Sequence, residues 1–231
     1  MATTMTARPS LYRTTVGQKV AVAASGSFLI LWVTAHMLGN LKILIGKGEF
    51  NSYAHFLRRM LAPPFPNTWF LWIIRILLIA ALAIHVYYTV ALARRSRAAR
   101  QHRYEHPDHI QADPASTTMR WGGMTLAAFI VFHLLNFTWG AYHPGTPFIK
   151  ADPYANVVGL FNVWWIDVIY LIAMAFLALH IYHGFWSVFQ TFGVNNRRWD
   201  RVIRAWATGW AAVVFLGFIV IPFAVLGGLV S

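Results

Sequence analysis

The chain has 231 residues, of which 58% are hydrophobic and 11% are charged, whereas a soluble domain has about 45–50% and about 25%. This composition excludes a disordered tail and a soluble enzyme. The net charge of +12 by itself suggests nucleic-acid binding, so the position of the basic residues decides its meaning. Cysteine is absent, which excludes disulfides, thiolate metal sites and thioether-attached cofactors.

Five long apolar segments are nearly free of Lys, Arg, Asp and Glu. A membrane-spanning helix needs about 20 predominantly apolar residues, and the segments lack the alternating pattern of a transmembrane β-barrel. We therefore predict an all-α integral membrane bundle that forms a single membrane domain over residues 1–231. The predicted transmembrane helices lie at about 20–43, 68–94, 120–142, 158–190 and 204–229.

The basic residues are concentrated on one predicted side of the membrane. Of the 19 Lys and Arg residues, 13 precede the first helix or lie in the second and fourth connections. The positive-inside rule then predicts a cytoplasmic N-terminus and a C-terminus outside. The charge thus reports topology, and we expect no nucleic-acid partner. These residues are Arg8, Arg13, Lys19, Arg94, Arg95, Arg97, Arg100, Arg103, Arg120, Arg197, Arg198, Arg201 and Arg204.

The two outer connections differ in composition. Residues 46–67 mix aromatic, Gly and Pro positions, which predicts a partly helical segment at the outer interface. Residues 143–157 are Pro-rich, and we expect a plain loop there.

Five of the ten histidines lie inside the predicted helices, where an ionisable side chain is costly and usually faces the bundle interior. They are His36, His85, His133, His180 and His183. A neutral histidine bonded to a neighbouring helix would explain any one of them. Aligning the first helix with the third pairs His36 with His133, 97 positions apart, and aligning the second with the fourth pairs His85 with His180, 95 apart. This pattern indicates a duplicated helix pair, with chance similarity of apolar segments as the alternative.

The predicted topology places His36 and His133 in the outer half of the membrane, and His85 and His180 in the inner half. Two imidazoles from different helices at one level can hold a haem iron from both sides, and without Cys the haem would be of the non-covalent b type. His183 stays an alternative to His180. We therefore predict two b haems that form an electron path across the membrane.

Small residues accompany the histidines. Gly26 and Gly123 each lie ten residues before the histidine of their helix, or roughly 15 Å along it, which places them near the inner histidine level. They would either let a flat ring approach the helix or let helices pack closely.

Other polar residues have weaker assignments. We assign Arg75 to the propionates of the outer haem, and the alternatives are a pair with Asp167 or extension of its side chain to the interface. Histidines in the second connection favour a contact surface for a soluble partner over a metal site. Four residues of the outer segment could bond a quinone carbonyl, with interfacial solvation as the alternative. They are Asn51, Tyr53, His55 and Arg58.

Sequence motifs along nearly the whole chain resemble the cytochrome b membrane anchor of succinate dehydrogenase and fumarate reductase complexes, specifically the single-chain, five-helix, two-haem type. The motifs are Gly17-Gln18-Lys19 with Ser25-Gly26, His36-Met37-Leu38-Gly39-Asn40-Leu41, Phe50-Asn51-Ser52-Tyr53, Leu179-His180, His183-Gly184-Phe185-Trp186-Ser187 and Phe189-Gln190-Thr191-Phe192-Gly193. Dihaem fumarate reductases of this type can carry a Glu two residues before the fourth-helix ligand, where this chain has Ala178.

The resemblance implies an inner haem held by His85 and His180 and an outer haem held by His36 and His133. It also implies a flavoprotein and an iron–sulfur subunit on the cytoplasmic face, a location in the cytoplasmic membrane and electron transfer to a quinone, here menaquinone, near the outer haem. The chain would be a subunit of the enzyme without the succinate-oxidising site. The alternatives are a dihaem cytochrome b of a hydrogenase or formate dehydrogenase, and a haem-free membrane anchor or transporter.

Overall fold

The structure is a computed structural model that describes residues 14–99 and 114–231. Its described residues form seven α-helices and one 3-10 turn, with no strand. The elements are α1 (Thr15–Leu41), η2 (Lys42–Ile45), α2 (Lys47–Arg59), α3 (Trp69–Ala98), α4 (Pro114–Phe137), α5 (Pro153–Phe161), α6 (Trp164–Thr191) and α7 (Asp200–Leu226). Five of the helices are long and apolar enough to cross a membrane, as predicted.

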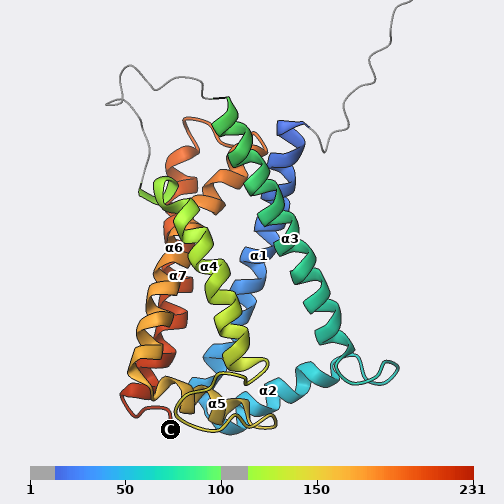
Figure 1. The fold of residues 1–231 in the computed structure, drawn as a ribbon, viewed down its shortest axis with the longest axis vertical. Coiled ribbons are helices and arrows are strands. Elements are labelled where there is room, and N and C mark those ends of the chain that lie inside the picture. Colours follow the sequence, from blue (N-terminus) through green and yellow to red (C-terminus); the bar gives the residue numbers. More distant parts are fainter. Residues whose placement is uncertain (1–13, 100–113) are drawn as a thin grey trace, which may run out of the picture.

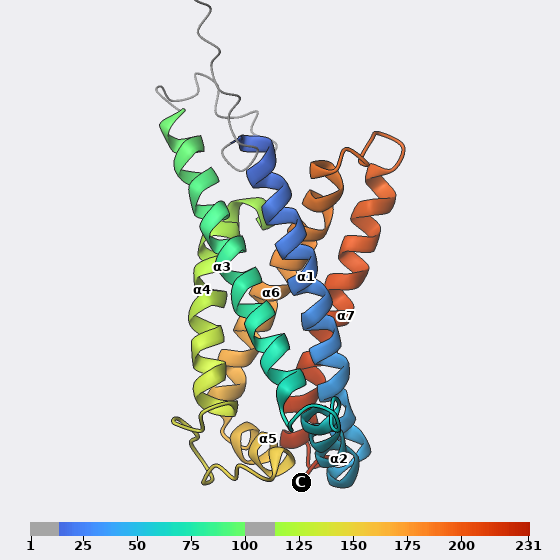
Figure 2. The same ribbon diagram turned by 90° about the vertical axis from the view of Figure 1, so that its right-hand side faces the viewer.

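The long helices run side by side, and the two short helices α2 and α5 lie together across one end of the bundle (Figures 1 and 2). We call this the α2/α5 end. The opposite end, where α1, α4 and α7 begin, is called the basic end after the Lys and Arg residues of its described part. These residues are Lys19, Arg94, Arg95, Arg97, Arg120, Arg197, Arg198, Arg201 and Arg204. Four basic residues lie outside the described residues: Arg8, Arg13, Arg100 and Arg103. The histidines of the second connection, His102, His106 and His109, lie outside them too.

Helices α1 and α6 lie at the centre of the bundle. Among the described residues, α3 packs along α1 and α4 packs along α6, while α7 packs against both α6 and α1. Each of the pairs α1/α3 and α4/α6 is joined by a short helix at the α2/α5 end (Figure 2). The predicted duplication therefore extends to a third element, because α1-α2-α3 and α4-α5-α6 share the same order and placement.

Large apolar side chains cover the outside of the long helices. Leu31, Ile79 and Val213 are 62%, 69% and 59% exposed. In water, apolar patches of this extent would drive association, but in a bilayer they face acyl chains, and helices with internally satisfied backbones are suited to that setting. The exposure pattern therefore agrees with a multi-pass helical membrane protein.

The expectation of a plain loop over residues 143–157 is wrong for its last part. Pro153–Phe161 form the helix α5, so the fourth spanning helix begins at Trp164 instead of residue 158. The Asp152 side chain accepts a hydrogen bond from the Ala155 backbone N–H at 3.1 Å, and Pro153 occupies the first turn. This combination starts a helix because it satisfies an end N–H and presets φ. The partly helical segment expected over 46–67 is confirmed by α2.

The remaining helix bounds differ from the predicted ones by a few residues. At the basic end α1, α3, α4 and α7 extend further than hydropathy suggests, because helical hydrogen bonds continue through the charged residues at the interface. At the α2/α5 end α4 stops at Phe137, five residues earlier than predicted. The chain turns there through Gly140, whose positive φ of 63° suits a residue without a side chain.

Candidate metal centres: two histidine pairs

Four of the predicted histidines meet in two pairs inside the bundle. The rings of His36 on α1 and His133 on α4 have centres 5.9 Å apart and perpendicular planes. The rings of His85 on α3 and His180 on α6 have centres 6.1 Å apart with planes at 58°. The pairing is the one that the internal repeat and the predicted depths suggest.

The distance between the two rings of each pair suits one metal ion bound by both. A metal bound by two imidazole nitrogens, at about 2 Å from each, places the ring centres roughly 6 Å apart. Both observed separations, 5.9 Å and 6.1 Å, match this value. Among the described residues neither α1 with α4 nor α3 with α6 is a closely packed helix pair, so the rings meet across the bundle interior.

In each pair, one ring has a hydrogen-bonding partner at Nδ1. His133 Nδ1 lies 3.3 Å from the Tyr170 hydroxyl, and His85 Nδ1 lies 3.3 Å from the Val22 carbonyl oxygen. A metal-ligating histidine nearly always donates its second ring N–H to such a group. The Nε2 atoms of His85 and His133 are therefore available for a metal.

The other two rings, those of His36 and His180, have no hydrogen-bond partner at Nδ1 among the described contacts. His36 stacks on Trp32 with ring centres 5.9 Å apart, and Phe218 of α7 lies 6.1 Å away. His180 Nδ1 is buried without a hydrogen-bond partner among the described residues. His36 thus has aromatic neighbours on α1 and α7, and His180 has a buried ring nitrogen without a partner in the described part of the chain.

The choice between His180 and His183 depends on which ring faces α3. The ring contact that His85 makes across the bundle is with His180, whereas His183 contacts Trp186, with ring centres 6.2 Å apart. The geometry favours His180, and the identity of the ligand stays a prediction.

The two glycines differ in their surroundings. A Cβ atom on Gly26 would lie 3.1 Å from Cε1 of His85, so this glycine lies against the His85 ring, at the predicted level. A Cβ atom on Gly123 would meet no atom within 4 Å. A direct contact with a cofactor stays a prediction for both.

Arg75 and Asp167 do not pair. The ion pairs between described residues are Lys42–Glu49, Lys47–Asp152 and Arg204–Asp200. The Arg75 guanidinium lies over the Trp72 ring at 5.0 Å. Asp167 is buried, and neither carboxyl oxygen has a hydrogen-bond partner in the described part of the chain. The alternative of an Arg75–Asp167 pair is therefore not observed, and the propionate role of Arg75 stays a prediction.

The four residues predicted near a quinone lie on α2, where their described contacts are with different neighbours. Tyr53 lies against Gly39, where a Cβ atom would come within 2.9 Å of its ring. Arg58 Nη2 donates to the Lys150 carbonyl at 3.4 Å, and His55 is exposed. Both ends of the Asn51 amide are used within the protein, as described next.

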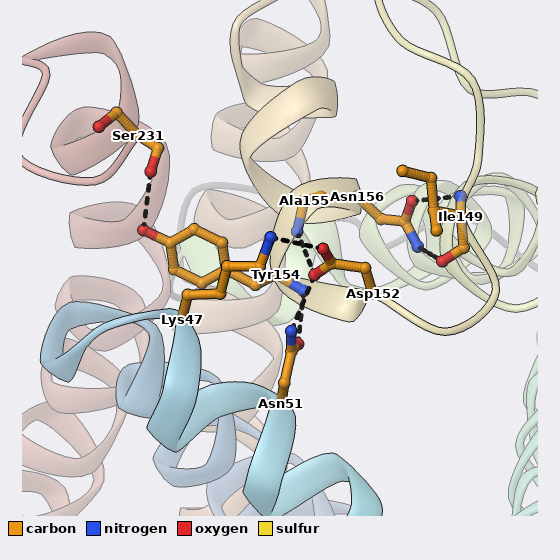
Figure 3. Close-up of polar contacts among 8 residues, drawn as sticks. All are labelled: Lys47, Asn51, Ile149, Asp152, Tyr154, Ala155, Asn156 and Ser231. Carbon is orange, nitrogen blue, oxygen red and sulfur yellow. Dashed lines mark hydrogen bonds and ion pairs between the residues drawn. The ribbon is translucent and has the colours of Figure 1, made fainter.

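Asn51 belongs to a polar clamp between α2 and α5 (Figure 3). Its Nδ2 donates to Asp152 at 2.8 Å, and its Oδ1 accepts from the Tyr154 backbone N–H at 3.0 Å. Lys47 forms an ion pair with Asp152 at 2.7 Å. The hydrogen bonds from Lys47 and Asn51 lower the pKa of the Asp152 carboxyl to about 2. This clamp fixes the two short helices to each other.

Sequence reasoning missed Tyr170 and Asn136, which lie beside His133. Asn136 is fully buried and Tyr170 is 8% exposed. The available signal was an Asn three residues after His133 within an apolar segment, because a buried amide in such a segment requires partners.

Comparison of the chain with protein-family models, with curated proteins and with solved structures found no match. Among the described residues there is no group of three or more acidic or histidine side chains that could hold a metal ion. The fold and the site together define a multi-pass helical membrane protein with two histidine pairs as its candidate metal centres.

Proposed function

We propose that this protein is the dihaem cytochrome b membrane anchor of a succinate:quinone oxidoreductase. In this function it passes electrons from flavoprotein and iron–sulfur subunits through two b haems to a membrane quinone, menaquinone. The observation that carries the proposal is the pair of cross-bundle histidine contacts, at 5.9 Å and 6.1 Å, on four different helices.

The residues present fit haem. The four imidazoles of the two pairs would hold two haem irons, two imidazoles to each iron, and Gly26 places no side chain between α1 and the His85 ring. A bis-imidazole haem supplies one-electron chemistry with its ligands retained. The chain's own part is to hold the rings, to orient those of His85 and His133 through Val22 and Tyr170, and to pack Trp32 and Phe218 against His36.

The two levels lie along a path through the bundle. Gly26 is level with His85, and His36 follows ten residues later on the same helix, which corresponds to about 15 Å along α1. The two centres together would carry electrons between the two sides of the membrane.

Charge supports the direction in which the chain is inserted. Among the described residues the basic end carries most of the Lys and Arg side chains, so by the positive-inside rule this end would lie in the cytoplasm, with the N-terminus inside and the C-terminus outside. The flavoprotein and the iron–sulfur subunit would dock on this end. Because the chain has no Cys, it has no thiolates for an iron–sulfur cluster, and partner chains must supply the succinate-oxidising site.

The quinone is proposed at the α2/α5 end, near the His36–His133 pair. Tyr53, His55 and Arg58 lie on α2 there, whereas Asn51 serves the clamp with Asp152. The complex as a whole would be able to form higher oligomers.

The test is the reduced-minus-oxidised visible spectrum of the protein purified intact from its membrane, combined with the identity of the subunits that co-purify. We expect a b-type α-band, two haems per chain, and partner subunits that contain flavin and iron–sulfur clusters. Haem-free, intact protein would contradict the proposal. Two haems with a hydrogenase or formate dehydrogenase partner would retain the dihaem cytochrome b and reject the succinate reaction.

A further inference from the structure

A buried chain of hydrogen bonds starts at His133 and ends on the backbone. His133 Nδ1 lies 3.3 Å from the Tyr170 hydroxyl. The Tyr170 hydroxyl donates to Asn136 Oδ1 at 3.1 Å, and Asn136 Nδ2 donates to the Tyr142 carbonyl oxygen at 2.6 Å. Four residues from α4, α6 and the turn after α4 thus form one polar line.

The direction of every hydrogen bond in this chain follows from its last member. A carbonyl oxygen can only accept, so the NH₂ group of Asn136 faces Tyr142 and its oxygen faces Tyr170. The Tyr170 hydroxyl proton is then directed to Asn136, which leaves the phenol oxygen to accept from His133. His133 must therefore carry its proton on Nδ1 and keep the Nε2 lone pair for a metal.

The surroundings of these hydrogen bonds are apolar and buried. Phe129 and Phe161 lie against the Tyr170 ring, with ring centres 4.9 Å and 5.0 Å away. Asn136 is fully buried. In such an apolar setting hydrogen bonds polarise one another, and an unmade hydrogen bond is costly. The orientation of the His133 ring is thus held by two side chains and one carbonyl.

We propose that Tyr170 and Asn136 are positioning residues of the His36–His133 metal centre, which set the tautomer of His133 and raise its basicity as a ligand. The inference rests on the proposed function, since it requires a haem iron at this pair. A more basic imidazole stabilises oxidised over reduced iron. The hydrogen bonds from His133 to Tyr170 and from Tyr170 to Asn136 would therefore lower the midpoint potential of a haem held by His36 and His133.

The test is Tyr170→Phe, which removes the hydroxyl and keeps the ring. The midpoint potentials of both haems and the g-values of their low-spin ferric signals are measured in the purified complex. We expect the midpoint potential of the haem at the His36–His133 pair to rise by up to about 59 mV, which is a tenfold change in the equilibrium constant of a one-electron couple. The g-values of that haem alone should change. A second variant, Asn136→Leu, keeps the phenol and should shift the same potential in the same direction by less.

Tyr154→Phe is the matched control, because Tyr154 is 7% exposed and its hydroxyl donates to a backbone carbonyl, that of Ser231, away from the histidines. It should leave both potentials unchanged. Unchanged potentials and g-values in Tyr170→Phe, with two haems present, would overturn the inference and leave the proposed function intact. Equal shifts of both haems would also overturn it, because they indicate a general change of the fold.

Loss of haem from Tyr170→Phe leaves the decision to Asn136→Leu, in which an unchanged potential would overturn the inference. Wild-type protein without haem would overturn the inference and the proposed function together.

Discussion

The two histidine pairs use the same ligand type but differ in what holds the second ring nitrogen. At the His36–His133 pair the partner is a side chain, Tyr170, backed by Asn136. At the His85–His180 pair the partner is the backbone carbonyl of Val22 in α1. A backbone partner cannot be removed by a substitution, whereas a side chain can. One level of the bundle is therefore open to tuning by single substitutions, and the other is fixed by helix packing.

The largest expected effect breaks each pair separately. His36→Ala or His133→Ala should remove one haem, and His85→Ala or His180→Ala should remove the other, because each substitution takes away one of the two imidazoles that would hold that iron. Haem content and the potential of the remaining haem are measured after purification. His143→Ala is the control, since the ring nitrogens of His143 contact the backbone carbonyl oxygens of Thr146 and Asn156 outside the long helices. If His183→Ala removed the haem at the His85 level and His180→Ala retained it, His183 would be the ligand instead of His180.

A second substitution should affect only the His85–His180 level. In Gly26→Leu the new side chain meets the His85 ring, since even a Cβ atom would lie 3.1 Å from Cε1. We expect loss of most of the haem at this pair and retention of the other, measured by haem content and redox titration. Gly209→Leu on α7 is the matched control, because a Cβ atom there meets no atom within 4 Å. Equal haem loss in both variants would contradict the assigned contact.

Acid should weaken the α2/α5 end, next to the His36–His133 pair, through Asp152. Its pKa is lowered to about 2 from an ordinary 3.8 by Lys47 and Asn51. A lowered pKa means that the ionised carboxyl stabilises the fold; this contribution is complete above the ordinary value and is lost as the pH falls towards 2. Asp152→Asn should lower the thermal midpoint in detergent at pH 5 and converge with wild type near pH 2.

The size of that effect follows from the contacts of Asp152. Asparagine caps a helix as well as aspartate, so Asp152→Asn removes the charged contact with Lys47, and an exposed ion pair contributes less than about 1 kcal/mol. Glu49→Gln is the control, because Glu49 pairs with Lys42 at 3.9 Å and its side chain is 61% exposed. Parallel midpoints of Asp152→Asn and wild type from pH 5 to pH 2 would rule out the clamp as the acid-sensitive element.

The smallest expected effect concerns Ser25, the one side chain with a polar contact to His85 Nδ1 among the described residues. The contact is long, 3.4 Å, and the Ser25 hydroxyl donates to the Ala21 carbonyl at 2.7 Å. Ser25→Ala should leave the potential of the His85–His180 haem nearly unchanged, because Val22 keeps its hydrogen bond. A shift as large as that of Tyr170→Phe would remove the difference between the two levels.

The long helices and the histidine pairing could be predicted from the sequence because each depends on one simple quantity. The apolar length of a segment defines a membrane span, and the distance of a histidine from the start of its span defines its depth. His36 with His133, and His85 with His180, follow from these two quantities and from the repeat.

The short helix α5 and the Tyr170–Asn136 chain could not be predicted in the same way. Pro153 suggested a loop, although Asp152 before it supplies a helix cap. Tyr170 and His133 are 37 positions apart on different helices, and their contact depends on how α4 and α6 are rotated against each other. The sequence also left open a pair between Arg75 and Asp167, whereas the Arg75 guanidinium lies over the Trp72 ring.

The packing of the outer helices has a consequence for how the molecule is assembled. Among the described residues, α3 has α1 as its one long packing partner and α4 has α6, whereas the histidine pairs connect α3 to α6 and α4 to α1. A metal at the His85–His180 pair would thus attach α3 to α6, and a metal at the His36–His133 pair would attach α4 to α1. Cofactor insertion would then be the step that locks α3 and α4 in place, and these two helices would be the first to be cleaved by protease in cofactor-free protein.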